Sequence, residues 1–117
     1  MNAAPQPQRG EVWLAQLNPT RRHEQAGMRP VLIVSVNPFN ASPAGLVYIA
    51  PITRTARGVP LHVPVAPPEG GLRAPSVILC DVARSISTER LVEGPWGSIS
   101  PATMAQVEDR LRRVFGL

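Results

Sequence analysis

The chain has 117 residues, a length that fits one domain with one modest core. Its net charge is +4 and all of its basic residues are arginine, which favours an anionic partner, most commonly nucleic acid. The single cysteine, Cys80, excludes a disulfide within the chain, and we expect it to be a small buried hydrophobe. The apolar runs are too short for a signal peptide or a membrane span, so we expect a cytoplasmic protein.

The first third of the chain predicts a tail, two strands and a long loop. Residues 1–8 carry two prolines and no apolar period, so we expect a flexible tail before a single domain over residues 9–117. Residues 11–17 are expected to form a first strand. The polar segment 18–28 is longer than an ordinary hairpin connection, and long loops in compact domains are often functional. Residues 30–36 are apolar on both faces and predict a buried strand.

The middle of the chain predicts short strands separated by turns. Residues 37–45 are expected to form a turn or a single helical turn, and residues 46–52 a third strand that ends at Thr53. Residues 61–65 predict a further strand. Pro64 cannot donate a hydrogen bond to a strand ladder, so this strand should lie at an edge or carry a bulge.

The last third predicts strands followed by a helix. Residues 76–80 are the clearest buried strand and are expected to run on towards residues 84–86, with a helical turn at 87–90 and a short strand near Trp96. Ser100 and Pro101 are typical of a helix start. Apolar residues then recur at helical spacing up to Gly116, which should end the helix; they are Met104, Val107, Leu111, Val114 and Phe115.

The order of these elements indicates the fold class. Five or six short strands precede one helix, and strands and helices do not alternate, which argues against a parallel sheet. We therefore predict a mainly β fold with some α-helix: a small, strongly bent antiparallel barrel with a packed C-terminal helix.

Few kinds of catalytic chemistry fit the sequence. His23 and His62 are isolated and no set of residues has metal-ligand spacing, so we expect no metal and no cofactor. What remains is a set of loop arginines, which alone would be ordinary surface charges but together could line a groove for a phosphodiester backbone. Thr53 adds a hydroxyl donor, although its role could be simple strand termination. The loop arginines are Arg21, Arg22, Arg29, Arg54, Arg57, Arg73 and Arg84.

A series of segments in this order resembles the MazF/PemK family of toxins. The series begins with Arg-Gly-Glu-Val-Trp at 9–13 and Asn-Pro-Thr at 18–20, and its strongest part is Glu-Gln-Ala-Gly-Met-Arg-Pro at 24–30. It continues with Ala-Pro-Ile-Thr at 50–53 and with Asp81 and Arg-Ser-Ile at 84–86. The resemblance covers roughly residues 9–117.

The resemblance implies a sequence-selective, metal-independent endoribonuclease toxin that cleaves single-stranded messenger RNA. It also implies an SH3-like barrel of the PemK/CcdB type, a homodimer, and a cognate MazE-like antitoxin with an acidic tail. The family's catalytic pair falls on Arg29 and Thr53. Two other readings stay open: a non-catalytic CcdB-like toxin that binds gyrase, and a plain SH3-like interaction module.

Physical chemistry suggests roles for the residues of this site. The guanidinium of Arg29 suits a negatively charged phosphorane, and Thr53 could donate a further hydrogen bond. Glu24 is either the proton acceptor or an ion-pair partner that orients Arg29. Val82 replaces a glutamine common in relatives, which puts the base preference in doubt. The residues expected to contact RNA are Arg21, Arg22, His23, Gln25, Arg54, Arg57 and Arg84.

Overall fold

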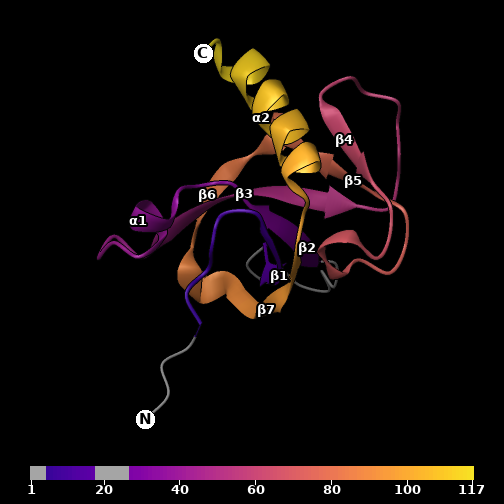
Figure 1. Cartoon of the computed structure of the whole chain (residues 1–117). Helices are drawn as coiled ribbons and strands as arrows, with labels where there is room; N and C mark the ends of the chain where they lie inside the picture. The colour runs from indigo at the N-terminus through magenta and orange to yellow at the C-terminus, as the bar shows by residue number, and fades with distance from the viewer. Residues whose placement is uncertain (1–4, 18–26) are drawn as a thin grey trace.

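The computed structural model describes residues 5–17 and 27–117, and within them one antiparallel sheet carries the fold, with a long helix at the C-terminus (Figure 1). The strands are β1 (Glu11–Gln16), β2 (Met28–Ile33), β3 (Leu46–Thr53), β4 (His62–Val65), β5 (Ser76–Leu79), β6 (Arg84–Ser87) and β7 (Leu91–Ser98). The helices are α1 (Asn37–Asn40), α2 (Pro101–Phe115) and the short 3-10 helices η1 (Glu69–Gly71), η2 (Cys80–Val82) and η3 (Thr88–Arg90).

The sheet is organised around β3. Neighbouring strands follow the order β4-β5-β3-β2-β1-β7, and β6 also pairs with β3. The predicted antiparallel fold with a C-terminal helix is confirmed. Among the described residues, no strand pairing joins β4 to β7, so the ladder bends strongly but keeps two ends. Pro64 lies in β4, at one of these ends, as predicted for a strand that cannot complete its ladder.

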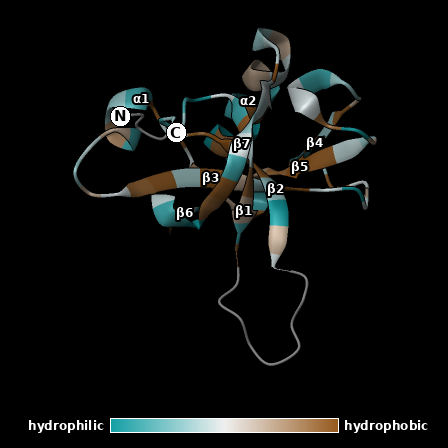
Figure 2. Ribbon diagram, turned by 90° about the horizontal axis from the view of Figure 1, so that it is seen from below, coloured by the Kyte–Doolittle hydropathy of each residue, from teal (hydrophilic) through white to brown (hydrophobic). Residues whose placement is uncertain are grey.

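The centre of the sheet is buried on both faces, which explains the nearly continuous apolar run of β2. Leu32 packs in one core cluster with Met104 and Val107 of α2. Its neighbours Val31 and Ile33 point to the other face and pack in a second cluster. All three β2 side chains are fully buried, and the hydrophobic colouring extends along much of β3 and β5 (Figure 2).

Two strands differ from the sequence prediction. The segment predicted to run from residue 76 to 86 as one strand is broken by η2, because β5 and β6 pair with successive parts of β3. The turn lets the chain follow the bend of β3. The last strand is also longer than predicted: β7 covers eight residues. The sequence does not indicate the full strand, because it contains Gly94 and Pro95, which are both unusual inside a strand. These two residues lie where the pairing of β7 with β1 is irregular.

The helical turn predicted in residues 37–45 is confirmed as α1. Its last residue, Asn40, is a buried polar residue. The Nδ2 of Asn40 donates to the Pro7 carbonyl at 3.3 Å, so the end of the predicted tail contacts the domain. This hydrogen bond satisfies a side chain that would otherwise be costly to bury.

Helix α2 has the predicted ends but is only partly covered. The Ser100 hydroxyl accepts a hydrogen bond from the Thr103 N–H at 3.1 Å, and Gly116 closes the helix with a φ of 71°. Met104 and Val107 are buried. Phe115, in contrast, is 61% exposed, because the second half of the helix extends beyond the sheet (Figure 1).

The start of α2 is tied to η1 by a carboxylate. Glu69 Oε2 accepts the Ser100 N–H at 2.8 Å. Hydrogen bonds from the Thr103 side chain and the Ser100 backbone lower the pKa of Glu69 below its ordinary value. This anchor holds η1 against β7: a Cβ atom on Gly71 would lie 2.5 Å from the Trp96 carbonyl oxygen.

The first prediction concerns pH and the Glu69 carboxylate. Because its folded-state pKa is lowered, the carboxylate stabilises the fold above its ordinary pKa of 4.5, and this stabilisation is lost as pH falls through the folded-state value. Glu69→Gln keeps an oxygen acceptor but removes the charge. We expect its free energy of unfolding to be lower than that of the wild type by about 1 kcal/mol at pH 7. In urea unfolding, the difference should shrink as the pH is lowered below about 4.5; a constant difference would contradict this role.

A second prediction concerns the contact between η1 and β7. Gly71→Ala would place a Cβ against the Trp96 backbone at a φ of 75°, and we expect it to lower the free energy of unfolding by about 3 kcal/mol. Gly45→Ala is the matched control, since Gly45 has a φ of 68° but nothing within 4 Å of the added atom. Gly45→Ala should lower the free energy of unfolding by only about 1 kcal/mol in the same urea titration. Equal losses would show that the close approach is not a constraint.

Candidate functional site

The site lies where β2 and β3 separate. The paired residues run from Ile33 with Ile49 to Val31 with Pro51, and there the pairing stops. Continued in register, the next residues on the same face would be Arg29 and Thr53. Instead, β3 continues at Ile52 and Thr53 as a partner of β5, while β2 stays paired with β1. The diverging strand ends leave space beside both side chains.

Two cavities adjoin this point, and Arg29 and Thr53 line both of them. The larger cavity has a volume of about 750 Å³ and reaches the loop after η1 and strand β7. The smaller cavity, of about 540 Å³, reaches β4 and η2. Volumes of roughly 300–1,000 Å³ are typical of ligand sites. The structure therefore brings together the two residues that the resemblance implied as a catalytic pair, although 23 residues separate them in the sequence.

The side chains of this pair are suited to an anion. Arg29 is half-buried, and among the described residues no carboxylate lies within ion-pair distance of it. Thr53 is also half-buried, and its hydroxyl oxygen accepts the Thr55 N–H at 3.3 Å. A hydroxyl that accepts from the backbone keeps its own proton to donate. The pair can thus offer a planar guanidinium fork and one O–H donor to phosphate oxygens.

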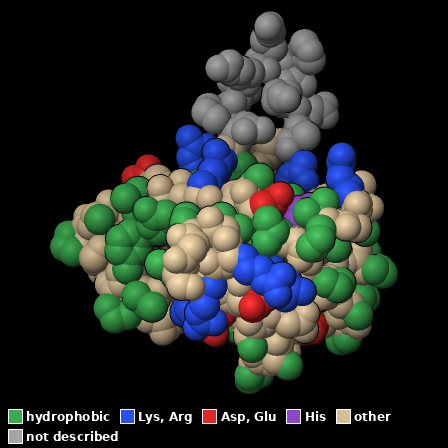
Figure 3. Space-filling model, turned by 90° about the horizontal axis from the view of Figure 1, so that it is seen from above, with side chains coloured by type: hydrophobic (Ala, Val, Ile, Leu, Met, Phe, Trp, Pro, Cys, Tyr) green, Lys and Arg blue, Asp and Glu red, His purple; other side chains and the backbone are tan. Residues whose placement is uncertain are grey.

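The described arginines fall into two groups at this end of the molecule. Three exposed guanidinium groups line the cavities and have no hydrogen bond or ion pair within the described ranges; they belong to Arg54, Arg57 and Arg73. Arg84 and Arg90 instead donate to the Leu17 carbonyl, at 2.8 and 3.4 Å. Several basic side chains also gather on the face of the molecule that Figure 3 shows. Arg84 therefore helps to hold the end of β1, and its expected RNA contact stays a prediction.

A histidine–aspartate pair in the smaller cavity was not identified from the sequence. His62 Nε2 lies 3.0 Å from Asp81 Oδ1. The two residues are 19 positions apart, and no spacing rule connects them; antiparallel pairing of His62 with Leu79 brings them together. The pair places a carboxylate in the same cavity as Arg29 and Thr53.

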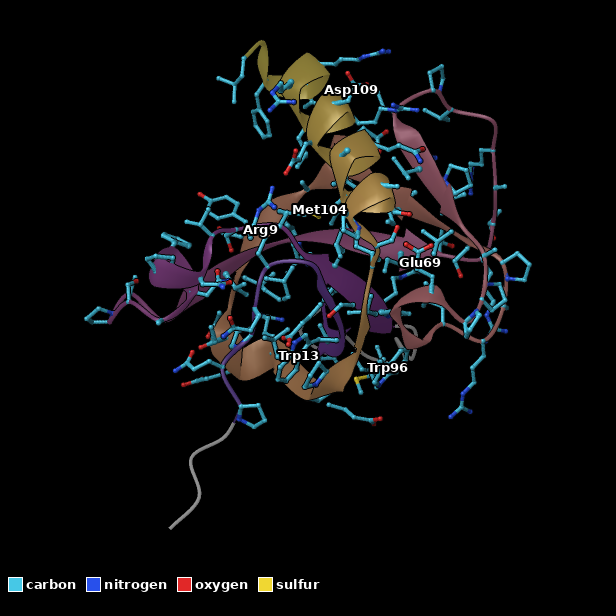
Figure 4. All side chains as sticks on the ribbon, viewed as in Figure 1. Arg9, Trp13, Glu69, Trp96, Met104 and Asp109 are labelled. Carbon is cyan, nitrogen blue, oxygen red and sulfur yellow. The ribbon has the colours of Figure 1, made fainter. Side chains whose placement is uncertain are left out.

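The larger cavity contains a second pair that sequence reasoning missed. Trp96 Nε1 donates to Glu93 Oε2 at 3.0 Å, and both residues line the cavity. The sequence signal was weak because Gly94 and Pro95 obscure the strand that carries both side chains. Figure 4 shows Trp96 at the edge of the molecule beside the loop that follows η1.

Five predicted site residues lie outside the described residues. They belong to the loop between β1 and β2 and are Arg21, Arg22, His23, Glu24 and Gln25. The described chain resumes at Gly27, whose carbonyl accepts the Leu17 N–H at 2.8 Å, so the two ends of this loop meet directly beside Arg29.

The Cys80 thiol is not placed for catalysis. Burial raises the pKa of the Cys80 thiol to about 11, and nearby Asp81 adds to the rise while Arg110 opposes it. The expected small buried hydrophobe is therefore confirmed.

Within residues 5–17 and 27–117, no group of three histidine, cysteine or acidic side chains is arranged to share a metal ion. None of the described helices is long and apolar enough to cross a membrane.

Comparison with known proteins adds independent information. Residues 8–115 match the family of PemK-like and MazF-like toxins of type II toxin–antitoxin systems. The chain is 33% identical to endoribonuclease MazF9 of Mycobacterium tuberculosis over 109 residues, covering 89% of this chain and 92% of the relative. It is 35% identical to endoribonuclease MazF of Staphylococcus epidermidis over 112 residues, covering 93% and 91%.

The fold comparison agrees with the sequence comparison. A structure of a MazE–MazF complex from Deinococcus radiodurans superposes with a TM-score of 0.82 and 27% identity, covering 97% of this chain and 99% of that one. The ordered motifs, the β2–β3 site and these similarities agree. The chain belongs to the family of PemK-like and MazF-like toxins of type II toxin–antitoxin systems.

Proposed function

We propose that this protein is an endoribonuclease toxin that cleaves single-stranded RNA without a metal ion. The observation that carries the proposal is the position of Arg29 and Thr53, which line both cavities at the point where β2 and β3 separate. The relatives named endoribonuclease MazF support an RNA substrate. Messenger RNA in the cytoplasm is the proposed target.

The reaction is an attack of a ribose 2′-OH on the adjacent phosphate. The 2′-OH gives its proton to a base as a bond forms between the 2′-oxygen and phosphorus. The bond from phosphorus to the 5′-oxygen breaks and the 5′-oxygen takes up a proton, which leaves a 2′,3′-cyclic phosphate and a 5′-OH. The phosphorane that forms carries extra negative charge, which the Arg29 fork and the Thr53 hydroxyl stabilise. Arg29 does not act as the base, because a guanidinium stays protonated at neutral pH. Attack in line requires an unstacked strand, so the substrate is single-stranded.

The exposed arginines bind the strand on either side of this phosphate. Arg54 and Arg73 line the larger cavity and Arg57 lines the smaller one, so positive charge extends from Arg29 in both directions. Each contact to a phosphate releases counterions, which makes binding salt-dependent. The residues of the 18–26 loop that were expected to contact RNA remain part of this proposal, together with Arg84.

We also propose a homodimer and a cognate antitoxin. The related MazF of Deinococcus radiodurans is described in complex with MazE. This chain exposes apolar side chains that suit a protein partner, including Tyr48, Val82 and Phe115. An acidic segment of the antitoxin would compete with RNA for the same arginines, which explains how binding silences the toxin.

The catalytic pair can be tested by substitution. Arg29→Ala is expected to lower kcat by about 100-fold or more, because it removes the fork that holds the phosphorane. Arg29→Lys should lose less, since it keeps the charge. Thr53→Val should lower kcat, whereas Thr53→Ser, which keeps the hydroxyl, should retain the wild-type kcat. Arg112→Ala, an exposed arginine of α2, is the control and should keep full activity.

The measurement is cleavage of single-stranded RNA in EDTA, with the product ends identified by mass. Full activity of Arg29→Ala, or activity lost to the chelator, would disprove the proposed chemistry. Absence of any RNA cleavage by the wild type would favour a toxin that acts by binding alone.

Two carboxylates are candidates for the proton acceptor. Glu24 lies outside the described residues, and its other role would be to orient Arg29. Asp81 lines the smaller cavity, where its Oδ1 faces His62 and its second oxygen can accept a proton. Removal of the acceptor by Glu24→Gln or Asp81→Asn should lower kcat by about 10²–10⁴-fold in single-turnover cleavage. If both variants keep the wild-type kcat, neither carboxylate takes the proton.

A further inference from the structure

The larger cavity extends beyond Arg29 and Thr53 to a wall that the proposed chemistry does not use. This wall is formed by Trp96 and Glu93 of β7, with exposed Arg73 at its margin. The cavity has room for more than a phosphate group, since its volume of about 750 Å³ lies in the range of sites for complete small molecules. The cavity can therefore hold a second part of an RNA strand beside the phosphate.

The backbone around Trp96 packs closely against η1. A Cβ on Gly71 would lie 2.5 Å from the Trp96 carbonyl oxygen, and a Cβ on Gly97 would lie 2.9 Å from the Gly70 carbonyl carbon. The ring also packs against the core cluster that contains Val12, and it is half-buried. A rigid aromatic ring with one part on the core and the rest in a cavity is a stacking surface for a nucleobase.

The glutamate makes this wall chemically different from the rest of the cavity. Glu93 is the one acidic side chain among the described residues that line it, beside Arg29, Arg54 and Arg73. A carboxylate repels phosphate and only accepts hydrogen bonds. The Trp96 N–H occupies one lone pair of Oε2, which orients the group and leaves Oε1 available. The ligand at this position must therefore donate hydrogen bonds.

Among nucleobases, guanine meets this requirement best. Its Watson–Crick edge carries N1–H and N2–H₂ side by side, so it can offer two donors to one carboxylate. Adenine and cytosine offer one amino group next to an acceptor, and uracil offers one N–H between two carbonyl oxygens. Protein side chains read unstacked RNA bases through these edges.

We propose that Trp96 and Glu93 form a subsite for a guanine next to the phosphate held by Arg29 and Thr53. The base stacks on the indole of Trp96, and its N1–H and N2–H₂ donate to Glu93. Arg73 contacts the backbone of the same nucleotide. The inference rests on the proposed RNA substrate, and it adds a base preference that the sequence did not disclose.

The test uses 2′-O-methyl RNA oligonucleotides, which lack the attacking 2′-OH and cannot be cut. Three probes of the same sequence carry guanine, inosine or adenine at one position, and inosine lacks only the N2 amino group. Binding is read from quenching of Trp96 fluorescence, with Trp96→Leu to identify the Trp96 signal. The wild type should bind the guanine probe about tenfold more tightly than the inosine probe.

Glu93→Ala should bind guanine and inosine probes equally, whereas the exposed Glu89→Ala, outside both cavities, should keep the wild-type preference. Equal binding of the two probes by the wild type, or a preference that survives Glu93→Ala, would overturn the subsite. The outcome is separable from the proposed function. RNA cleavage without a guanine preference rejects the subsite alone, and guanine-selective binding without cleavage of ordinary RNA rejects the nuclease.

Discussion

The separation of β2 from β3 is the constraint on which the rest of the site depends. Pairing ends at Val31 and Pro51, because β3 bends away to pair with β5. A fully paired sheet would place Arg29 and Thr53 side by side on a packed face with no room for a ligand. The bend keeps both residues on strands and leaves room for two cavities that both residues line. Rigid strands are a better support for a reacting phosphate than a loop, because small displacements are costly in catalysis.

The charges around the site have two distinct tasks. Arg84 and Arg90 donate to the carbonyls of Leu17 and Gln16 and so hold the end of β1 in place. Arg54, Arg57 and Arg73 have no partner among the described residues and line the cavities. An arginine already bonded to the backbone offers fewer donors to a ligand, whereas an unengaged one keeps its full fork. The net charge of +4 therefore understates how strongly this end attracts an anion.

Sequence reasoning predicted the elements that have a clear period or clear end signals. The buried run of β2, the Ser100 start of α2 and the Gly116 stop all follow from local chemistry, and the structure contains them. Arg29 and Thr53 were identified by motif, and the structure brings them together. The break at η2 and the length of β7 were missed because they depend on the bend of β3 and on a proline-containing strand. The pairs His62–Asp81 and Glu93–Trp96 were missed for a related reason: each needs strand geometry that no local pattern records.

In the proposed site, different strands bind the RNA phosphate and the RNA base. In that site, Arg29 and Thr53 bind a phosphate that every nucleotide carries, so this pair would not distinguish one RNA sequence from another. Glu93 and Trp96 come from β7, which pairs with β1 and not with β2 or β3. Under this proposal, a change of side chain on β7 would alter the base that is bound without moving Arg29 and Thr53. The limit on such changes is the contact with η1, because Gly71 leaves no space for a Cβ beside the Trp96 backbone. The backbone of this wall is closely packed, so the proposed base preference would change only through the side chains that project from it into the cavity.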